Sequence, residues 1–518
     1  MKDWHVTCNI GFERRGASHH RQQGAALSLS IPKEMFWMEQ VSLLINGEDV
    51  FTLSVFERCQ PLSGEVVSVS AAADAQHARD AADAAAHAFP LWAATLPGER
   101  RAKLLAAADC LICHMPDFVT TMMAETGATA QWAEFNVRVA ADNLREAASM
   151  TTQIGGDHIP SNVPGNFAVA VRKPAGVVLG IAPWNAPVIL GVRAIAMPLA
   201  CGNTIILKAS ELCPATHRLI GRVMQEAGFA PGVVNVISHD RADAAAIVQT
   251  LIEHPAVRRV NFTGSTRVGR IVAETAARQL KPALLELGGN NPLVVLEDAD
   301  LDAAVDAAAF GAFMNQGQIC MSTGRVVVAE AIADEFVEKF AARARSVKCG
   351  DPRKTDALMG PLVSRDAAAR IDGLIRDATN RGARVAAGGE HDGALMQATV
   401  IDRVTPDMPI YSEELFGPVA TVVRVSNDDD AVRVANDTEY GLSAAVFSRD
   451  ICRALAVADR IDTGICHINS STVHDEAQMP FGGVKASGYG RFGGKEAIAE
   501  FTDVRWLTVQ TSPRRYPI

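Results

Sequence analysis

Cysteine is scarce in this chain, with 10 residues among 518, and its spacing is irregular. A fold held together by disulfides needs many more cysteines in a much shorter chain. The thiols are therefore expected to be reduced, as in the cytoplasm, and a single cysteine can be a candidate for chemistry. Short internal repeats and coiled-coil runs are also missing, which excludes repeat and fibrous architectures.

Clustered positive charge is missing as well. The formal net charge is −10, and no run of Lys and Arg is long enough to follow a phosphate backbone. Nucleic acid is therefore not an expected partner, whereas a small molecule is. The His, Cys, Asp and Glu residues show no zinc-like spacing, so the sequence predicts no metal site.

Long apolar runs are few. Residues 1–37 contain no apolar segment of the length that a signal peptide needs, and this leader is expected to be disordered. Ala175–Val192 is free of charge for 18 residues, but Pro183 and Pro187 interrupt it. A strand, a turn and the start of a helix fit these prolines, whereas a membrane helix does not. The sequence predicts neither export nor a membrane span.

Two α/β domains are predicted from the pattern of apolar residues. The amino-terminal third has helical periodicity at residues 74–93, 99–113 and 131–148. Short β-branched runs then alternate with helical stretches. The runs lie at Val177–Ile181, Thr204–Leu207, Val233–Ile237, Val257–Phe262, Leu293–Leu296, Arg325–Val328, Val419–Val425 and Ala444–Phe447, and helices are expected at Ile332–Val347 and Arg365–Arg381. This alternation is typical of parallel sheets covered by helices on both faces.

Cys320 is a candidate nucleophile. It ends the segment Asn315–Cys320, whose glycine and polar residues separate a helical stretch from the strand predicted at Arg325. A cysteine in such a loop near a helix terminus is expected to have a lowered pKa and to react as a thiolate. The alternative is a small core residue, which is the common role of a single cysteine.

Glu286 is a candidate general base. It follows the apolar run Ala283–Leu285 and precedes Gly288 and Gly289, which allow the backbone to turn sharply or to approach a ligand. Partial burial raises the pKa of a carboxylate, which suits it to activate water near neutral pH. A helix-capping or salt-bridged glutamate is the alternative.

Two further segments each follow a predicted strand and open a helix. Asn185, in Pro183–Asn185, has an amide that can donate to a developing oxyanion, although it can equally be an N-cap residue. Phe262–Gly269 offers backbone N–H groups that suit a pyrophosphate. Its Gly264 and Gly269 have a different spacing from the usual dinucleotide fingerprint, so the spacing alone supports this function only in part.

Together these segments resemble the aldehyde dehydrogenase superfamily, and the match runs from about Met38 to the carboxyl end. Glu286 and Cys320 are separated by 34 positions, and both motifs are similar to the family's glutamate and cysteine signatures. Met479–Gly490 is similar to its carboxyl-terminal signature. The resemblance implies Cys320 as nucleophile, Glu286 as the base for hydrolysis, and Asn185 with the Cys320 backbone N–H as the oxyanion hole.

The resemblance also implies NAD as the cofactor and a homodimer or homotetramer. The residues it assigns to the cofactor are Trp184, Lys208, Glu211, Gly264, Ser265, Thr266, Gly269, Glu414 and Phe416. Among these, Glu211 is expected to bind the adenine ribose and to repel the 2′-phosphate of NADP. The expected fold is a Rossmann-type cofactor domain (38–154 and 175–288), an α/β catalytic domain (289–485), and a β oligomerisation ribbon with tail (155–174 and 486–518).

Two positions depart from the common family pattern. Asn290 and Ala194 stand where many relatives have lysine. Neither position is the nucleophile, the base or an oxyanion donor. A lysine-based proton relay is therefore not expected here, although the overall chemistry is.

The substrate implied is an aromatic aldehyde. Ile159–Gly165, Arg193–Gly202 and Val473–Phe481 resemble the branch that oxidises hydroxybenzaldehydes in aromatic compound degradation, with vanillin as the nearest substrate and salicylaldehyde as the next. Arg193 is expected on the same helix as Asn185, where it can bind a ring hydroxyl or phenolate, and Trp132 and Phe481 are expected to pack on the ring. The alternative for Arg193 is an ion pair at a domain interface.

Other functions of the same family stay open at this stage. They are a broad-specificity aldehyde dehydrogenase, an acylating dehydrogenase that transfers the thioester to coenzyme A, and a non-catalytic structural protein. Acylating members usually lack the base at the position of Glu286. The presence of Glu286 with Cys320 and Asn185 favours hydrolysis and catalysis.

Overall fold

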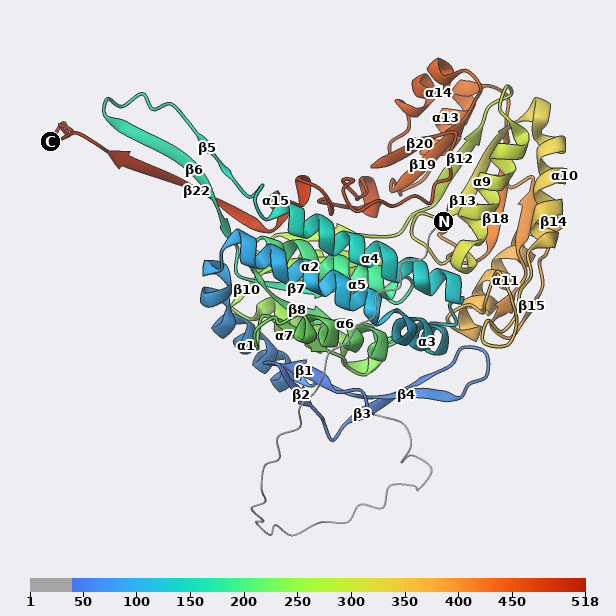
Figure 1. Cartoon of the computed structure of the whole chain (residues 1–518). Coiled ribbons are helices and arrows are strands. Elements are labelled where there is room, and N and C mark those ends of the chain that lie inside the picture. The colour runs from blue at the N-terminus through green and yellow to red at the C-terminus, as the bar shows by residue number, and fades with distance from the viewer. Residues whose placement is uncertain (1–39) are drawn as a thin grey trace, which may run out of the picture. The chain divides into compact units, whose positions relative to one another are not determined.

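The computed structural model describes residues 40–518, and the leader predicted at residues 1–37 lies outside the described residues. The described chain contains two large sheets, each covered by helices, and a three-stranded ribbon (Figure 1). The predicted α/β class with two parallel sheets is confirmed.

The first sheet has eight strands in the order β2-β1-β9-β8-β7-β10-β11-β21. Its strands are β1 (Leu43–Ile45), β2 (Glu48–Val50), β7 (Val177–Ile181), β8 (Thr204–Lys208), β9 (Val234–Ile237), β10 (Val257–Thr263), β11 (Ala283–Glu286) and β21 (Gly488–Tyr489). The five central strands from β9 to β11 are parallel, and the strands at both edges are antiparallel. Every residue of β7 and β8 is buried, as expected for strands with helices on both faces.

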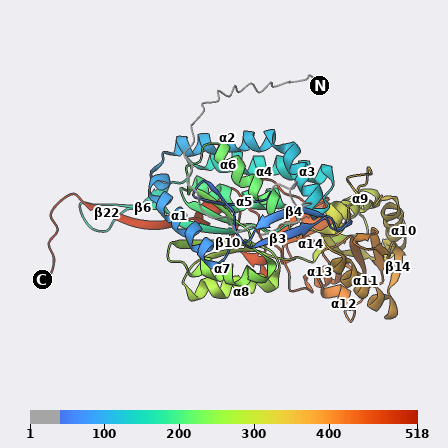
Figure 2. The same ribbon diagram turned by 90° about the horizontal axis from the view of Figure 1, so that it is seen from below.

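Helices cover both faces of this sheet (Figures 1 and 2). Val177, Leu179 and Ile181 of β7 pack with α1 (Ala75–Ala94), α7 (Ala244–Glu253) and α8 (Thr266–Arg278), whereas Val178 joins the core on the other face. That second core is formed with α2 (Pro97–Cys113), α3 (Met115–Thr126), α4 (Ala130–Met150), α5 (Pro187–Ala200) and α6 (Pro214–Glu226). The alternation along β7 follows from the two-residue repeat of a strand.

The second sheet has seven strands in the order β14-β17-β18-β13-β12-β19-β20. Its strands are β12 (Asn291–Val295), β13 (Thr323–Ala329), β14 (Arg384–Ala387), β17 (Thr399–Asp402), β18 (Val419–Val425), β19 (Ser443–Phe447) and β20 (Ile465–Ile468). One face packs on α9 (Leu301–Phe313) and α10 (Glu330–Ser346). The other packs on α11 (Arg365–Asn380), α12 (Pro409–Ser412), α13 (Asp428–Asn436) and α14 (Ile451–Ala458). All neighbouring strands run parallel except the pair β14 and β17, which is antiparallel.

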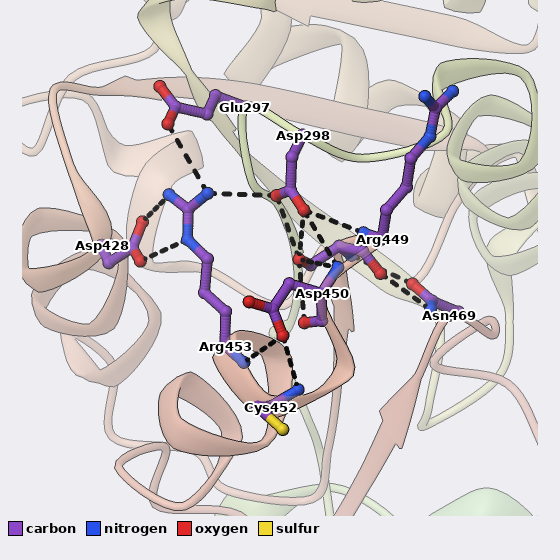
Figure 3. Close-up of polar contacts among 9 residues, drawn as sticks. Glu297, Asp298, Asp428, Arg449, Asp450, Cys452, Arg453 and Asn469 are labelled. Atoms are coloured by element: carbon purple, nitrogen blue, oxygen red, sulfur yellow. Dashed lines mark hydrogen bonds and ion pairs between the residues drawn. The ribbon is translucent and has the colours of Figure 1, made fainter.

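A polar network ties the ends of three strands in this sheet together (Figure 3). The Asp298 carboxylate, after β12, accepts from the Ser448 hydroxyl at 2.7 Å and from the Arg453 guanidinium at 3.1 Å. Arg453, on α14, also binds both carboxylate oxygens of Asp428 at the start of α13. Asn469, after β20, bonds to the backbone N–H and carbonyl of Ser448. The network therefore connects β12, β19 and β20 with two covering helices.

The ribbon consists of β5 (Gly156–His158), β6 (Asn166–Pro174) and β22 (Thr502–Gln510), in the order β22-β6-β5. Strands β6 and β22 pair antiparallel over nine residue pairs, from Thr502 opposite Pro174 to Gln510 opposite Asn166. Both views show β6 and β22 side by side and extended away from the two large sheets (Figures 1 and 2). The sequence prediction of a ribbon from these two segments is confirmed as a structure.

The elements that were not predicted include α3, the hairpin of β3 (Val55–Cys59) and β4 (Val66–Ala71), the short strands β15 (His391–Asp392) and β16 (Leu395–Met396), and β14, β17, β20 and α12 to α14 of the second sheet and its cover. The segment 486–518, predicted to belong with the ribbon, contributes β21 to the first sheet. Among residues 40–518, no single helix is long and apolar enough to cross a membrane. The joined pair α2 and α3, bent by 64°, meets the same length and composition criterion.

Candidate active site

The topology of the first sheet gathers motifs that are far apart in the sequence. From β7 the chain moves outward in both directions, through β8 and β9 on one side and through β10 and β11 on the other. In open α/β sheets, ligands bind in the crevice at the carboxyl ends of strands where the order reverses in this way. Asn185 follows β7, Gly264 follows β10, and Glu286 ends β11. The sheet therefore brings these three residues to one edge.

Cys320 comes from the connection between α9 and β13 of the second sheet. After α9, Asn315 and Gln316 have left-handed backbones with φ of 47° and 57°, which costs energy for residues other than glycine. Their side chains hold the turn. The Asn315 amide donates to the Asn185 carbonyl at 2.9 Å, and the Gln316 amide donates to the Pro361 carbonyl at 2.8 Å. The loop that carries Cys320 is therefore fixed against the end of β7.

Cys320 faces carboxylates. Its Sγ lies 4.0 Å from Oε2 of Glu286, and the residue is half-buried. Burial, together with the charges of Glu286 and Glu414, raises the pKa of the Cys320 thiol well above its usual value, and Arg193 only partly opposes this. The prediction of a lowered pKa is therefore wrong, because the fold buries the sulfur and places it beside negatively charged groups.

Glu286 is almost fully buried, with 1% of its surface exposed. Its Oε1 has no hydrogen-bond partner among the described residues. Burial raises the pKa of Glu286 to about 8, with Arg193 lowering it and Asp475 raising it further. Such a pKa lets one carboxylate both accept and release a proton near neutral pH. The capping and salt-bridge alternatives do not describe this residue.

Asn185 precedes α5, whose N-cap is Ala186 with no side-chain cap. The prediction that Asn185 and Arg193 share one helix is therefore wrong, because α5 begins at Pro187 and includes only Arg193. The Asn185 amide nitrogen donates to the Gln318 carbonyl at 2.9 Å, in the Cys320 loop. The Trp132 indole donates to the Asn185 carbonyl at 3.1 Å. These bonds direct the Asn185 amide toward the loop of Cys320.

One cavity of about 280 Å³ lies along the ends of β7, β10 and β11. Trp184, Gly264, Ser265, Glu414 and Phe416, all predicted to bind cofactor, line it. The rings of Trp184 and Phe416 meet edge to face, with centroids 5.7 Å apart. Glu414 Oε1 accepts from the Gly289 N–H at 3.0 Å, and burial raises the pKa of Glu414 to about 7.

Four other predicted cofactor residues lie outside the lining of that cavity. Lys208 is the last residue of β8 and is buried, which lowers its pKa despite the opposing charge of Glu211. Thr266 opens α8 and donates its hydroxyl to the Ala486 carbonyl at 3.1 Å. A Cβ at Gly269 would collide with the Leu287 side chain, so this glycine allows α8 to pack closely on the end of β11.

A second cavity, of about 270 Å³, meets the first at Asn185, Leu190 and Cys320. Its wall is mostly aromatic and aliphatic. The apolar lining includes Trp132, Phe135, Ile189, Phe310, Met314, Ile319 and Phe481. Trp132 and Phe481, which the sequence analysis expects to pack on the substrate ring, both line this cavity. Other large apolar residues of the wall, such as Phe135, Ile189, Phe310 and Met314, were missed because no short motif marks a pocket wall.

Arg193 lines the second cavity as predicted, and it is also ion-paired, which was the alternative. Its Nη2 lies 2.5 Å from Oδ2 of Asp475, and its guanidinium lies 4.4 Å from the centre of the Phe481 ring. The two charged residues are 282 positions apart in the sequence. Asp475 lies inside a segment already used for the family resemblance, but its pairing with Arg193 has no sequence signal.

Comparison with known proteins agrees with this geometry. Residues 51–507 match the model of the aldehyde dehydrogenase family. A vanillin dehydrogenase from Pseudomonas sp. strain HR199 is 60% identical over 483 residues, which are 93% of this chain and all of that protein. The crystal structure of a salicylaldehyde dehydrogenase from Pseudomonas putida G7, complexed with salicylaldehyde, is 49% identical with a TM-score of 0.91 over 92% of this chain and 99% of its own. A betaine aldehyde dehydrogenase from Staphylococcus aureus, crystallised with NAD+, is 31% identical with a TM-score of 0.88 over 92% and 96% of the two chains.

Proposed function

This chain belongs to the aldehyde dehydrogenase family, and we propose that it uses NAD to oxidise a hydroxylated aromatic aldehyde, such as vanillin, to the carboxylic acid. One observation supports this most directly. Two cavities meet at Cys320, and the one on the side of Trp132 has an aromatic wall with a single buried charged pair. An aromatic aldehyde fits such a wall, since ring packing supplies affinity and a polar pair supplies orientation.

The residues around the first cavity fit NAD. The N-terminus of α8, at Ser265 and Thr266, has backbone N–H groups suited to a pyrophosphate, and Gly288 leaves room beside the Glu414 carboxylate. Trp184, Gly264, Gly269 and Phe416 complete the proposed set at this end, with Lys208 and Glu211 at the adenine ribose. When bound, the nicotinamide supplies the hydride acceptor. The relative from S. aureus that was crystallised with NAD+ supports this choice.

In the first half of the reaction, Cys320 forms a bond to the aldehyde carbon. The Glu286 carboxylate, 4.0 Å from the sulfur, accepts the thiol proton, and the thiolate adds to the carbonyl. The carbonyl oxygen becomes an oxyanion, which the Asn185 amide and the Cys320 backbone N–H stabilise. Loss of hydride from the former aldehyde carbon leaves a thioester on Cys320.

In the second half, Glu286 acts as the base for hydrolysis. After losing its proton to solvent, the carboxylate removes a proton from water, and the hydroxide adds to the thioester carbonyl. Collapse of the tetrahedral intermediate breaks the carbon–sulfur bond, returns Cys320, and releases the acid. The unpartnered Oε1 of buried Glu286 is available for this water.

The substrate is proposed to lie in the second cavity, with its ring between Trp132 and Phe481 and its polar substituent toward Arg193. A salicylaldehyde-type substrate is the alternative within the same class, as in the relative from P. putida G7. A broad-specificity enzyme would not need a buried ion pair in an otherwise apolar wall. Acyl transfer to coenzyme A is disfavoured by the buried base Glu286, and a purely structural role by the complete set of Cys320, Glu286 and Asn185.

We also propose that the ribbon mediates a dimer or tetramer. Strand β22 is at the edge of its sheet, and all of its residues after Thr502 are exposed, including Val504 at 61% and Trp506 at 76%. An exposed apolar edge strand is a ready surface for pairing with another chain. We also propose the domain boundaries that go with this role. They are cofactor binding at 38–154 and 175–288, catalysis at 289–485, and assembly at 155–174 and 486–518, except that β21 belongs to the first sheet.

A single assay separates these functions. NADH absorbance is followed with vanillin, salicylaldehyde, benzaldehyde and propanal, each with and without coenzyme A. The proposal requires the highest kcat/KM for a hydroxybenzaldehyde and no stimulation by coenzyme A. A preference for propanal would contradict the aromatic substrate, dependence on coenzyme A would contradict hydrolysis, and inactivity with all four would contradict catalysis.

A further inference from the structure

Asp475 lines the substrate cavity, and one of its carboxylate oxygens lacks a hydrogen-bond donor. Its Oδ2 is bound to Arg193, and the side chains of the two residues are only 10% and 7% exposed. Its Oδ1 is shielded from solvent and has no hydrogen-bond partner in the described part of the chain. A buried carboxylate oxygen without a donor costs free energy, so such an atom in a cavity wall is a candidate to receive a donor from the ligand.

Arg193 is held in place from two sides. Asp475 binds its Nη2, and the Phe481 ring lies 4.4 Å from the guanidinium carbon. A guanidinium that is already paired with a carboxylate has less charge to offer a phenolate, and Asp475 repels a second negative charge in the same place. A neutral phenol avoids this repulsion because its hydroxyl donates a hydrogen bond.

We infer that Oδ1 of Asp475 accepts a hydrogen bond from the ring hydroxyl of the substrate, and that Arg193 is the positioning residue that holds Asp475 in the cavity wall. This inference rests on the proposed aromatic substrate and refines it. Asp475 then selects substrates whose ring substituent can donate a hydrogen bond. A methyl ether at the same ring position has no donor and loses this hydrogen bond. It also means that the cavity takes the protonated phenol in preference to the phenolate.

The test measures kcat/KM for 2-, 3- and 4-hydroxybenzaldehyde and for the three corresponding methyl ethers. The enzymes are the parent, Asp475→Ala and Asp475→Asn, with Glu476→Gln as a control on the neighbouring, partly exposed carboxylate. Benzaldehyde reports general damage, since Asp475 also influences Glu286 and Cys320. The informative quantity is the hydroxyl-to-ether ratio for the isomer that the parent prefers.

This ratio is expected to fall about tenfold or more in Asp475→Ala, with a smaller change for benzaldehyde and none in Glu476→Gln. An equal loss of kcat/KM on every substrate in Asp475→Ala would overturn the inference. The parent enzyme provides a second test that needs no variant. Its hydroxyl-to-ether ratio should fall as pH rises through the ionisation of the phenol, and a constant ratio would overturn the inference.

The same data distinguish this inference from the proposed function. A parent that prefers aromatic to aliphatic aldehydes but treats hydroxyl and ether alike would overturn the role of Asp475 alone. A parent that prefers propanal would overturn the aromatic substrate as well.

Discussion

Oε2 of Glu286 lies 4.0 Å from Sγ of Cys320, and both groups have raised pKa values for the same reason. Burial disfavours the charged form of each group and is the largest cause of both shifts, and the charge of Glu286 further raises the pKa of the Cys320 thiol. The ionisation of Cys320 therefore depends on the charge state of Glu286. This coupling means that the charge on Glu286 affects both the formation of the thiolate and the hydrolysis of the thioester.

Variants of the two residues should fail at different steps. Cys320→Ala should abolish dehydrogenase activity because no thioester forms, whereas Cys201→Ala, at a buried cysteine in the core, should stay active. Glu286→Gln should still form the thioester, with water accepting the thiol proton in place of the carboxylate, and should hydrolyse it about 100-fold more slowly or worse. Mass spectrometry of the Glu286→Gln enzyme after mixing with NAD and aldehyde should detect the acyl adduct. Turnover at the parent rate without an adduct would exclude Glu286 as the base.

The pH dependence of hydrolysis should follow Glu286. Its pKa of about 8 is raised by burial from the ordinary 4.5, and only the deprotonated form accepts a proton from water. Thioester hydrolysis should therefore rise about tenfold per pH unit below pH 8 and level off above it. Single-turnover measurements between about pH 6 and pH 9, in the parent and in Glu286→Gln, would check this. A flat parent profile would contradict the role of Glu286.

Glu211 should make the enzyme prefer NAD to NADP. This half-buried carboxylate follows β8, where the family resemblance implies the adenine ribose, and it would repel a 2′-phosphate. The buried Lys208 at the end of β8 limits the size of the effect. Glu211→Gln should reduce the preference in kcat/KM by about tenfold. A lower KM for NADP than for NAD in the parent would show that the prediction is wrong.

The ribbon should hold the oligomer together. Light scattering of the parent should give a mass above the 55.1 kDa of one chain. Replacing exposed apolar residues of β22 in a Val504→Lys and Trp506→Lys double variant should shift the mass toward the monomer, since charge on an edge strand opposes pairing. Leu91→Lys, at an exposed leucine of α1, is the control and should not change the mass. A monomeric parent would rule out this role.

The strands and helices were predictable where the apolar pattern is strong. The structure has β7 and β18 with the predicted bounds, because every residue of these strands except Arg424 is apolar or small and turn residues flank them. The helix α3 was missed because Pro116 follows a run that reads as the end of α2, although proline is well tolerated in a first turn. Short hairpins such as β15 and β16 bury too few apolar side chains to produce an alternating pattern in the sequence.

Only the site residues that lie within short sequence motifs could be predicted. Cys320, Glu286 and Asn185 each lie in a distinctive segment, and the structure brings them together. The state of the thiol was not predictable, because its pKa depends on carboxylates that only the fold places beside it. The Arg193–Asp475 pair was also beyond the sequence, because two residues 282 positions apart leave no local signal of contact.

The last prediction concerns stability, and it tests the network around Asp298 (Figure 3). Besides Ser448 and Arg453, the carboxylate accepts from the backbone N–H groups of Arg449 and Asp450 at 3.0 and 3.1 Å. Partial burial raises the pKa of Asp298, but these hydrogen bonds outweigh it and hold the pKa below its ordinary 3.8. Asp298→Ala should cost about 2 kcal/mol at neutral pH, mostly from the lost hydrogen bonds, because the partly exposed ion pair with Arg453 contributes little.

The sign of the pH effect follows from the lowered pKa. A carboxylate that binds its proton less tightly in the folded state stabilises that state above its ordinary pKa, and this contribution is lost as pH falls below it. The difference in unfolding free energy between the parent and Asp298→Ala should therefore shrink below about pH 4. Denaturant unfolding at neutral and acid pH measures it, with Asp429→Ala as the exposed control. Activity per folded molecule should be unchanged, because no residue of the network lines either cavity. An equal difference at both pH values would mean that the Asp298 charge is not what stabilises these strand ends.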